Sequence, residues 1–220
     1  RDVANGLAKS GFNRGDKLAI IGDNRPELYF GIMASQMLGG VPVPIYQDSI
    51  AEEMVYILEH AEVRFAIVED QEQVDKLVTI RDKLPNLEFI IYEDARGLRD
   101  YEERGLMSYA SVRKQGLSFA EENPNFVAEE IQKGSATDLA VMLYTSGTTG
   151  KPKGVMLSYD NVIATSRSGI QHDNLTANEK VVAYMPMAWI GDHLFSYGES
   201  LCVGFSVYCP ESADTVLQDV

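Results

Sequence analysis

Short apolar runs alternate with segments of helical spacing through the first half of the chain. The runs are bounded by turn residues, and the segments between them repeat apolar side chains every three or four positions. The strand-like runs of this half are residues 17–22, 64–69 and 87–92, and the helix-like segments are residues 27–38, 51–60 and 71–83; after residue 134 a further strand-like run follows at 138–144. Such alternation is typical of βαβ units. The sequence therefore predicts an α/β fold of mostly parallel sheets flanked by helices.

Local signals refine these elements. Pro26 is placed to begin a helix, because its missing N–H is unpaired there in any case. Pro42 and Pro44 cannot donate to a central ladder, so residues 41–46 are expected to form an edge or irregular strand. Residues 49–52 have the pattern of a capping box, and Ser158 is expected to cap a further helix.

The pattern is weaker in the middle of the chain. Residues 93–134 are dense in charge and interrupted by glycine, so we expect a solvated connection with two or three surface helices, the best at 108–120. Beyond it the sequence predicts strands at 155–157, 180–185 and 205–209, and helices at 160–170 and 192–201.

Composition excludes several classes of function. The chain has 220 residues and a net charge of −14, which argues against nucleic acid as a partner. The net charge does not exclude a nucleotide, which one local loop can bind. Cys202 and Cys209 are too few for a disulfide framework, and we expect both to be small buried hydrophobic residues. No apolar run has the length of a membrane span and no leader is evident, so a cytoplasmic protein is expected.

Residues 145–154 are unlike the rest of the sequence. They contain four hydroxyl residues, three glycines and two lysines directly after a predicted strand. Glycines let backbone N–H groups point into a concavity, and lysines supply positive charge. This composition at a strand end is typical of a polyphosphate site. The alternative is a flexible linker, but a linker is not expected between two apolar strands.

The loop does not have the spacing of a Walker A motif. Only two residues separate Gly147 and Gly150, and Pro152 follows Lys151 where that motif has Ser or Thr. Pro152 also disfavours a helical Lys151. We therefore expect a flexible loop over the phosphates instead of a helix N-terminus beneath them.

The run Tyr144-Thr145-Ser146-Gly147-Thr148-Thr149-Gly150-Lys151-Pro152-Lys153-Gly154-Val155 resembles the phosphate loop of the adenylate-forming superfamily. The resemblance extends to three other segments: residues 38–46, residues 51–69, and Met185-Pro186-Met187-Ala188-Trp189. It spans nearly the whole chain. It implies that residues 1–220 are part of the large N-terminal AMP-binding domain, with the remainder of that domain and a small C-terminal domain lying downstream.

The resemblance also implies a reaction. Members of the superfamily join a carboxylate to the α-phosphorus of ATP, release pyrophosphate, and in the ligase branches transfer the acyl group to coenzyme A. Residues 41–58 are most similar to the long-chain fatty acid branch. Rival interpretations are a ligase for an aryl or medium-chain acid and a non-catalytic nucleotide-binding module. Peripheral membrane contact and a homodimer are left open.

Site residues follow from the resemblance, position by position. The residues expected to hold the ATP phosphates are Thr145, Ser146, Gly147, Thr148, Thr149, Gly150, Lys151 and Lys153. Thr145 is also expected to lie near Mg²⁺. The groups that bind adenine and ribose and the lysine that promotes adenylation belong to later segments. The 220-residue chain alone is therefore expected to be inactive.

Trp189 stands where the superfamily often has histidine at the border of the acyl pocket, and His193 follows four residues later. The resemblance makes both candidates for the acyl pocket or its gate, and helical spacing favours one shared face. The alternative for Trp189, the only tryptophan, is a core residue. The adjacent Asp192 is expected to be a helix N-cap, because a carboxylate nucleophile needs no strong base.

Overall fold

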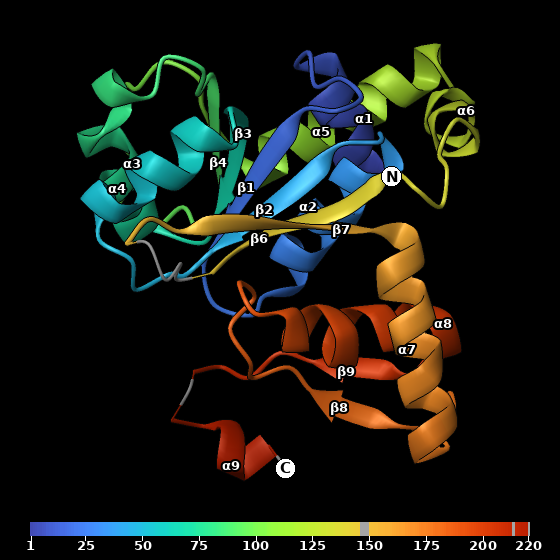
Figure 1. Ribbon diagram of the computed structural model, residues 1–220. Coiled ribbons are helices and arrows are strands. Elements are labelled where there is room, and N and C mark those ends of the chain that lie inside the picture. Colours follow the sequence, from blue (N-terminus) through green and yellow to red (C-terminus); the bar gives the residue numbers. More distant parts are fainter. Residues whose placement is uncertain (146–149, 213, 220) are drawn as a thin grey trace.

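The computed structural model describes residues 1–145, 150–212 and 214–219. Its upper half in Figure 1 contains a five-stranded sheet of order β2-β1-β3-β4-β5, with every neighbouring pair parallel. The strands are β1 (Lys17–Ile21), β2 (Val41–Ile45), β3 (Val63–Val68), β4 (Phe89–Tyr92) and β5 (Leu106–Ser108). The predicted α/β fold class is confirmed.

Helices cover both faces of this sheet. They are α1 (Asp2–Lys9), α2 (Pro26–Met37), α3 (Ala51–His60), α4 (Gln71–Thr79), η1 (Arg81–Lys83), α5 (Tyr109–Glu122) and α6 (Phe126–Gln132). Successive side chains of a strand point to opposite faces. Accordingly, Leu18 and Ile20 of β1 pack with α1, α2 and α5, whereas Ala19 and Ile21 pack with α3 and α4. Two cores on either side of one sheet explain why its strands are apolar throughout.

The strand with two prolines lies at the edge of the sheet, as predicted. Pro42 and Pro44 pair with β1 on one side only. Beyond β2 lies a separate antiparallel pair, β6 (Leu139–Thr145) and β7 (Lys153–Ser158). Met142 and Tyr144 of β6 join the core that contains α3 and α4, so this pair is anchored on the sheet by side chains.

The lower half of Figure 1 contains the elements that follow β7. Its elements are α7 (Tyr159–Asp173), β8 (Lys180–Val182), η2 (Asp192–Gly198), α8 (Glu199–Val203), β9 (Ser206–Tyr208) and α9 (Val216–Asp219). β8 and β9 are parallel. Arg25, just before α2, connects the two halves: its guanidinium bonds Glu69 Oε1 at 2.9 Å and the carbonyl of Pro210 at 2.8 Å.

Three local predictions need comment. Ser158 caps α7 in a capping box with Asn161, as expected, although glutamate is absent from the motif. The capping box predicted at residues 49–52 is wrong, because α3 begins after Ile50 without a side-chain cap. Residues 93–134 do contain two surface helices, α5 and α6, but also the unpredicted strand β5.

Helix α5 was expected in a solvated connection, but one of its faces is buried in the core. Val112 is fully buried, and Gly116 lies directly against α1. Their burial places α5 in the core beside α1 and α2. In the described part of the chain, no helix is long and apolar enough to cross a membrane.

Replacing Gly116 by alanine should destabilise the protein. A Cβ at Gly116 would overlap the backbone oxygen of Asp2 in α1, and the backbone cannot rotate away as a flexible side chain could. Overpacking of this kind costs about 1–3 kcal/mol, more than the gain in helix propensity of about 1 kcal/mol. Urea unfolding of the intact protein measures the change.

Gly134→Ala is the matched control, because a Cβ there meets only the Ile131 carbonyl, at 3.2 Å. Equal stability of the two variants would show that α1 and α5 separate without cost.

Candidate functional site

The two ends of the glycine-rich loop are held together by strand pairing. Thr145 at the end of β6 is opposite Lys153 at the start of β7, and Tyr144 is opposite Gly154. The loop thus leads from a strand into a strand, which confirms that no helix N-terminus follows it directly. It leaves an antiparallel pair, however, instead of the edge of a parallel sheet. Four candidate phosphate-binding residues lie outside the described residues: Ser146, Gly147, Thr148 and Thr149.

The described residues of the loop present polar groups to solvent. Thr145, Gly150, Lys151 and Lys153 are all exposed. Gly150 has φ of +87°, a conformation that other residues rarely adopt. A Cβ on Gly154 would be 3.2 Å from the Tyr144 ring, so glycine lets the ring pack against β7. The packing of Tyr144 against β7 therefore fixes the two ends of the loop.

Helix α3 supports the loop through an aromatic cluster that sequence reasoning missed. His60 Nδ1 is 2.7 Å from the Tyr144 hydroxyl, and the rings of Tyr56 and His60 stack at 5.4 Å. Lys151 Nζ is 5.3 Å from the centre of the Tyr56 ring, a cation–π contact. Burial raises the pKa of Tyr144 to about 12, so its hydroxyl stays protonated. The available signal was the spacing of Tyr56 and His60, one helical turn apart.

A second polar cluster lies beside the segment 185–189. The carboxylate of Asp192 is fully buried, and its Oδ1 accepts hydrogen bonds from the Tyr29 hydroxyl at 2.7 Å and from Asn24 Nδ2 at 3.2 Å. Asp192 was expected to cap a helix, but η2 has no side-chain cap and begins after Gly191. The correction has a physical reason: an enclosed carboxylate needs donors, and these come from α2 and the residue before Arg25.

His193 is also buried, and its Nε2 lies 3.0 Å from the Met187 carbonyl. A carbonyl only accepts, so His193 carries its proton on Nε2. Burial lowers the pKa of His193 to about 4, which keeps the ring neutral near pH 7. Burial raises the pKa of Asp192 to about 6, and hydrogen bonds to the carboxylate, led by that from Tyr29, oppose this rise. Neither residue is placed as a general acid or base toward solvent.

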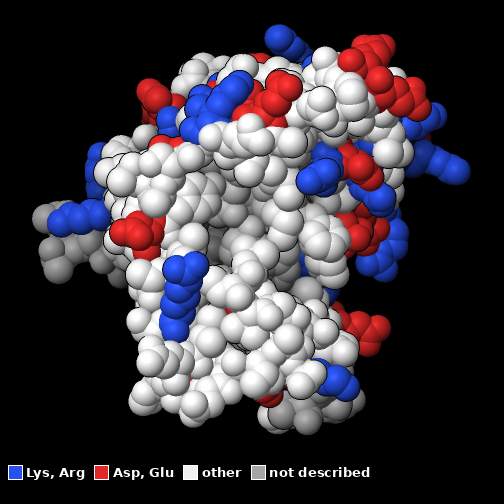
Figure 2. Space-filling view, turned by 90° about the vertical axis from the view of Figure 1, so that its right-hand side faces the viewer, with Lys and Arg blue, Asp and Glu red and all other residues white. Residues whose placement is uncertain are grey.

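His193 borders an apolar cavity of about 460 Å³ between α7, α8, β6 and α2. Among the described residues that line it, Arg167 alone is charged. Figure 2 views the side with α6 above and α7 and α8 below, which is hollowed near its centre and has few charged side chains below the hollow. The volume is in the range of about 300–1,000 Å³ for small-molecule sites.

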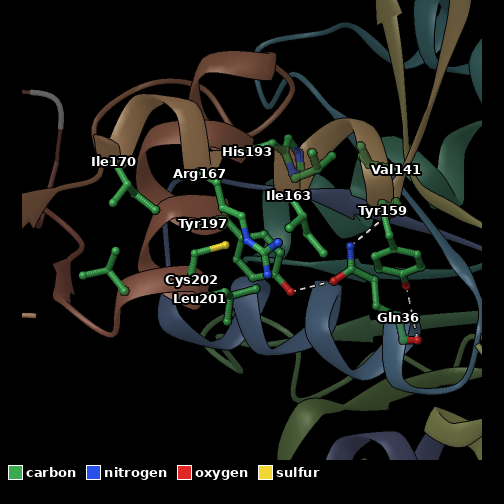
Figure 3. Close-up of a pocket in the computed structure, with 14 residues that line it drawn as sticks. Gln36, Val141, Tyr159, Ile163, Arg167, Ile170, His193, Tyr197, Leu201 and Cys202 are labelled. Atoms are coloured by element: carbon green, nitrogen blue, oxygen red, sulfur yellow. Dashed lines mark hydrogen bonds between the residues drawn. The ribbon is translucent and has the colours of Figure 1, made fainter. Parts of the chain in front are cut away.

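Gln36 connects this cavity to β6. Figure 3 shows it between Tyr159 and Tyr197, accepting at Oε1 from the Tyr197 hydroxyl at 2.7 Å and donating from Nε2 to the Ala140 carbonyl at 2.8 Å. Tyr197 in turn stacks on Tyr29, with ring centres 6.2 Å apart. The cavity wall and the strand that begins the loop are thus one packed unit.

Trp189 is 51% exposed, so the alternative that it fills the core is wrong. Trp189 is not among the residues that line the cavity with His193, so the expected shared face is not seen. Cys202 is exposed and Cys209 half-buried, so the expectation of two buried thiols is wrong. Within the described residues, no group of three or more His, Cys, Asp or Glu side chains is placed to hold a metal.

Single substitutions of Asp192 and His193 should expose two opposing pH effects. The raised pKa of Asp192 makes the folded state bind a proton more tightly, so acidification from about pH 6 to 4 stabilises it. The lowered pKa of His193 makes the folded state bind a proton less tightly, so acidification from about pH 6.5 to 4 destabilises it. Each effect is on the order of 3 kcal/mol, and in the wild type they largely cancel.

Relative to wild type, Asp192→Asn should therefore lose stability on acidification and His193→Gln should gain it. Urea unfolding of the intact protein across this pH range measures both. Parallel pH profiles for wild type and the two variants would contradict these assignments.

Comparisons with known proteins agree with this architecture. Residues 1–220 match the family described as AMP-binding enzyme. The long-chain-fatty-acid–CoA ligase ACSBG1 of Rattus norvegicus is 32% identical over 202 residues, 89% of this chain and 27% of that protein. ACSBG2 of Xenopus laevis is 29% identical over 94% of this chain and 28% of its own length. The chain thus spans about a quarter of these relatives.

Solved structures are similar as well. ATP-bound MatB from Rhodopseudomonas palustris has a TM-score of 0.73 and 25% identity, covering 94% of this chain and 37% of that one. The anthranilate CoA ligase AuaEII, in complex with anthranoyl-AMP, has a TM-score of 0.80 and 23% identity, covering 99% of this chain and 39% of that one. With the family match over its full length, the chain belongs to the adenylate-forming, AMP-binding enzyme family.

Proposed function

We propose that this chain is part of the N-terminal domain of an AMP-forming ligase that activates a long-chain fatty acid with ATP and transfers it to coenzyme A. The observation that carries the proposal is the loop between β6 and β7, whose strand-paired ends place Thr145 opposite Lys153. The fatty-acid ligase relatives, at 29–32% identity, support the substrate class.

The residues of the loop fit a polyphosphate. Hydroxyl, ammonium and backbone N–H groups are present, and no carboxylate occurs between residues 144 and 155. In a chain with a net charge of −14, this is a local concentration of donors. Thr145, Lys151 and Lys153 would hold the phosphates, together with residues 146–150. Their role is to orient the nucleotide and to offset charge on the departing pyrophosphate.

Thr145 would also be the contact of this chain with Mg²⁺. A hydroxyl oxygen is a suitable ligand for this ion, and Mg²⁺ commonly binds through few protein groups together with substrate phosphates. When bound, the ion neutralises phosphate charge. Thr145 is exposed at the end of β6, opposite Lys153, so its hydroxyl is accessible to an ion bound to the phosphates.

The acyl group would lie near Trp189 and the cavity beside His193. The half-exposed indole and the apolar lining match an apolar chain, whereas neutral His193 does not supply charge to the reaction. The attacking carboxylate is already a nucleophile, so the site needs positioning and no general base.

Given ATP, coenzyme A and palmitate, the intact protein should release AMP. With octanoate or benzoate in place of palmitate, AMP should be released more slowly. A coupled assay of AMP release across these acids measures the preference. Turnover with benzoate or octanoate and none with palmitate would favour the aryl or medium-chain ligase. No AMP release with any acid would favour a non-catalytic nucleotide-binding module.

Lys151→Ala in the intact protein should lower kcat/KM for ATP by about 10- to 100-fold, because a charge-assisted contact to phosphate is lost. Thermal stability should change little, since Lys151 is exposed and an exposed cation–π contact such as that with Tyr56 contributes at most about 1 kcal/mol. Lys114→Ala, which removes an exposed lysine from α5, is the control for net charge. An unchanged kcat/KM for ATP in the Lys151 variant would remove the loop from the nucleotide site.

A further inference from the structure

The segment 185–189 is held by side chains bonded to two of its carbonyls. Asn24 Nδ2 donates to the Met185 carbonyl at 3.0 Å, and His193 Nε2 donates to the Met187 carbonyl at 3.0 Å. A turn closes the segment, with the Trp189 N–H donating to the Pro186 carbonyl at 2.9 Å. The half-exposed Trp189 therefore extends from a backbone that these three hydrogen bonds hold in place.

The residues beneath the segment form one connected unit. The Tyr29 hydroxyl accepts from Asn24 Nδ2 and donates to Asp192 Oδ1, both at 2.7 Å. Exposed fractions are 7% for Asn24, 8% for Tyr29 and 0% for Asp192. Water does not readily replace a lost partner at such burial, so these hydrogen bonds specify one arrangement.

The position of Asn24 depends on one oxygen atom, the Tyr29 hydroxyl, because both residues donate to the Asp192 carboxylate. Its Oδ1 receives both donors, while its Oδ2 has no hydrogen-bond partner among the described residues. Loss of the Tyr29 hydroxyl would leave Asn24 as the remaining donor to Oδ1. The two hydrogens of Asn24 Nδ2 serve three acceptors, and the contact with Asp192 Oδ1 is the longest of them. To compensate the carboxylate for the lost donor, Asn24 would shift toward Oδ1, and the Met185 carbonyl bonded to it would leave its wild-type position.

We propose that Asn24, Tyr29 and Asp192 are positioning residues that fix the 185–189 segment and thereby set selectivity among carboxylic acids. None of the three lies in the glycine-rich loop, and their hydrogen bonds to one another and to Met185 do not involve it, so the KM for the acid is expected to change more than the KM for ATP. The proposal rests on the function proposed above, in which Trp189 borders the acyl group.

Tyr29→Phe in the intact protein tests this role, because it removes one oxygen and keeps the ring that stacks on Tyr197. The KM for palmitate should rise by about 10-fold and the ratio of kcat/KM for palmitate over octanoate should fall, while the KM for ATP stays within about twofold. Asn24→Ala, which removes the donor to Met185 directly, should shift the same ratio and serves if Tyr29→Phe does not fold.

Tyr109→Phe is the matched control. The Tyr109 hydroxyl, on α5, is buried without a hydrogen-bond partner among the described residues, so its loss should leave every kinetic constant unchanged. A second readout is the emission of Trp189, taken as the difference from a Trp189→Phe background. Acrylamide should quench it more strongly in Tyr29→Phe and Asn24→Ala, and equally in Tyr109→Phe and wild type.

The outcomes separate this proposal from the proposed function. A wild-type protein that activates no acid refutes the function, and the quenching of Trp189 then still tests the positioning role. An active wild type whose Tyr29→Phe and Asn24→Ala variants keep both the acid selectivity and the quenching overturns the positioning role. Equal losses for palmitate and ATP also overturn it, since they would indicate general damage to the fold.

Discussion

The carboxylate of Asp192 is enclosed by protein, and its two donors come from residues more than 160 positions earlier in the chain. A buried carboxylate is costly unless it is hydrogen-bonded, so α2 and the residues before it must lie against η2 whenever Asp192 is ionised. This contact, with Arg25 bonding Glu69 and the Pro210 carbonyl, sets how the lower half of the molecule meets the sheet. The segment with Trp189 takes its place from that junction.

The glycine-rich loop depends on a different kind of support. Its strand-paired ends rest on α3 through Tyr144, His60 and Tyr56, and β6 is tied to α2 through Gln36. Helix α2 therefore contacts both regions: Gln36 near its C-terminus reaches β6, and Tyr29 near its N-terminus reaches Asp192. A polar loop and an apolar pocket wall are thus placed by one buried helix. In the proposed reaction, two anions must be brought together, and this common scaffold supplies the geometry.

Much of the sheet could be predicted from sequence because burial on both faces leaves continuous apolar runs, as in β1 and β3. The edge position of β2 followed from Pro42 and Pro44. Strand β5 has three residues and depends on its pairing with β4, so it has no periodicity of its own to detect. The role of α5 depends on Gly116, whose closeness to α1 is a tertiary fact.

The candidate site divides in the same way. The loop was evident from a contiguous run of residues, although four of its members lie outside the described residues. The partners of Asp192 and His60 were not evident, because Tyr29 and Tyr144 are remote in sequence and only folding brings them near. Local spacing could indicate a helix cap at Asp192, but only the tertiary structure shows which donors enclose its carboxylate.

The fate of the carboxylate oxygens tests the proposed chemistry most directly. A carboxylate that attacks the α-phosphorus leaves one of its oxygens on AMP when the thiol of coenzyme A takes the acyl group. The intact protein, given palmitate labelled with a heavy oxygen isotope in both carboxylate positions, is predicted to release AMP that carries one labelled oxygen, as read by mass spectrometry. Unlabelled AMP, or label found in orthophosphate with release of ADP, would contradict an acyl-adenylate route.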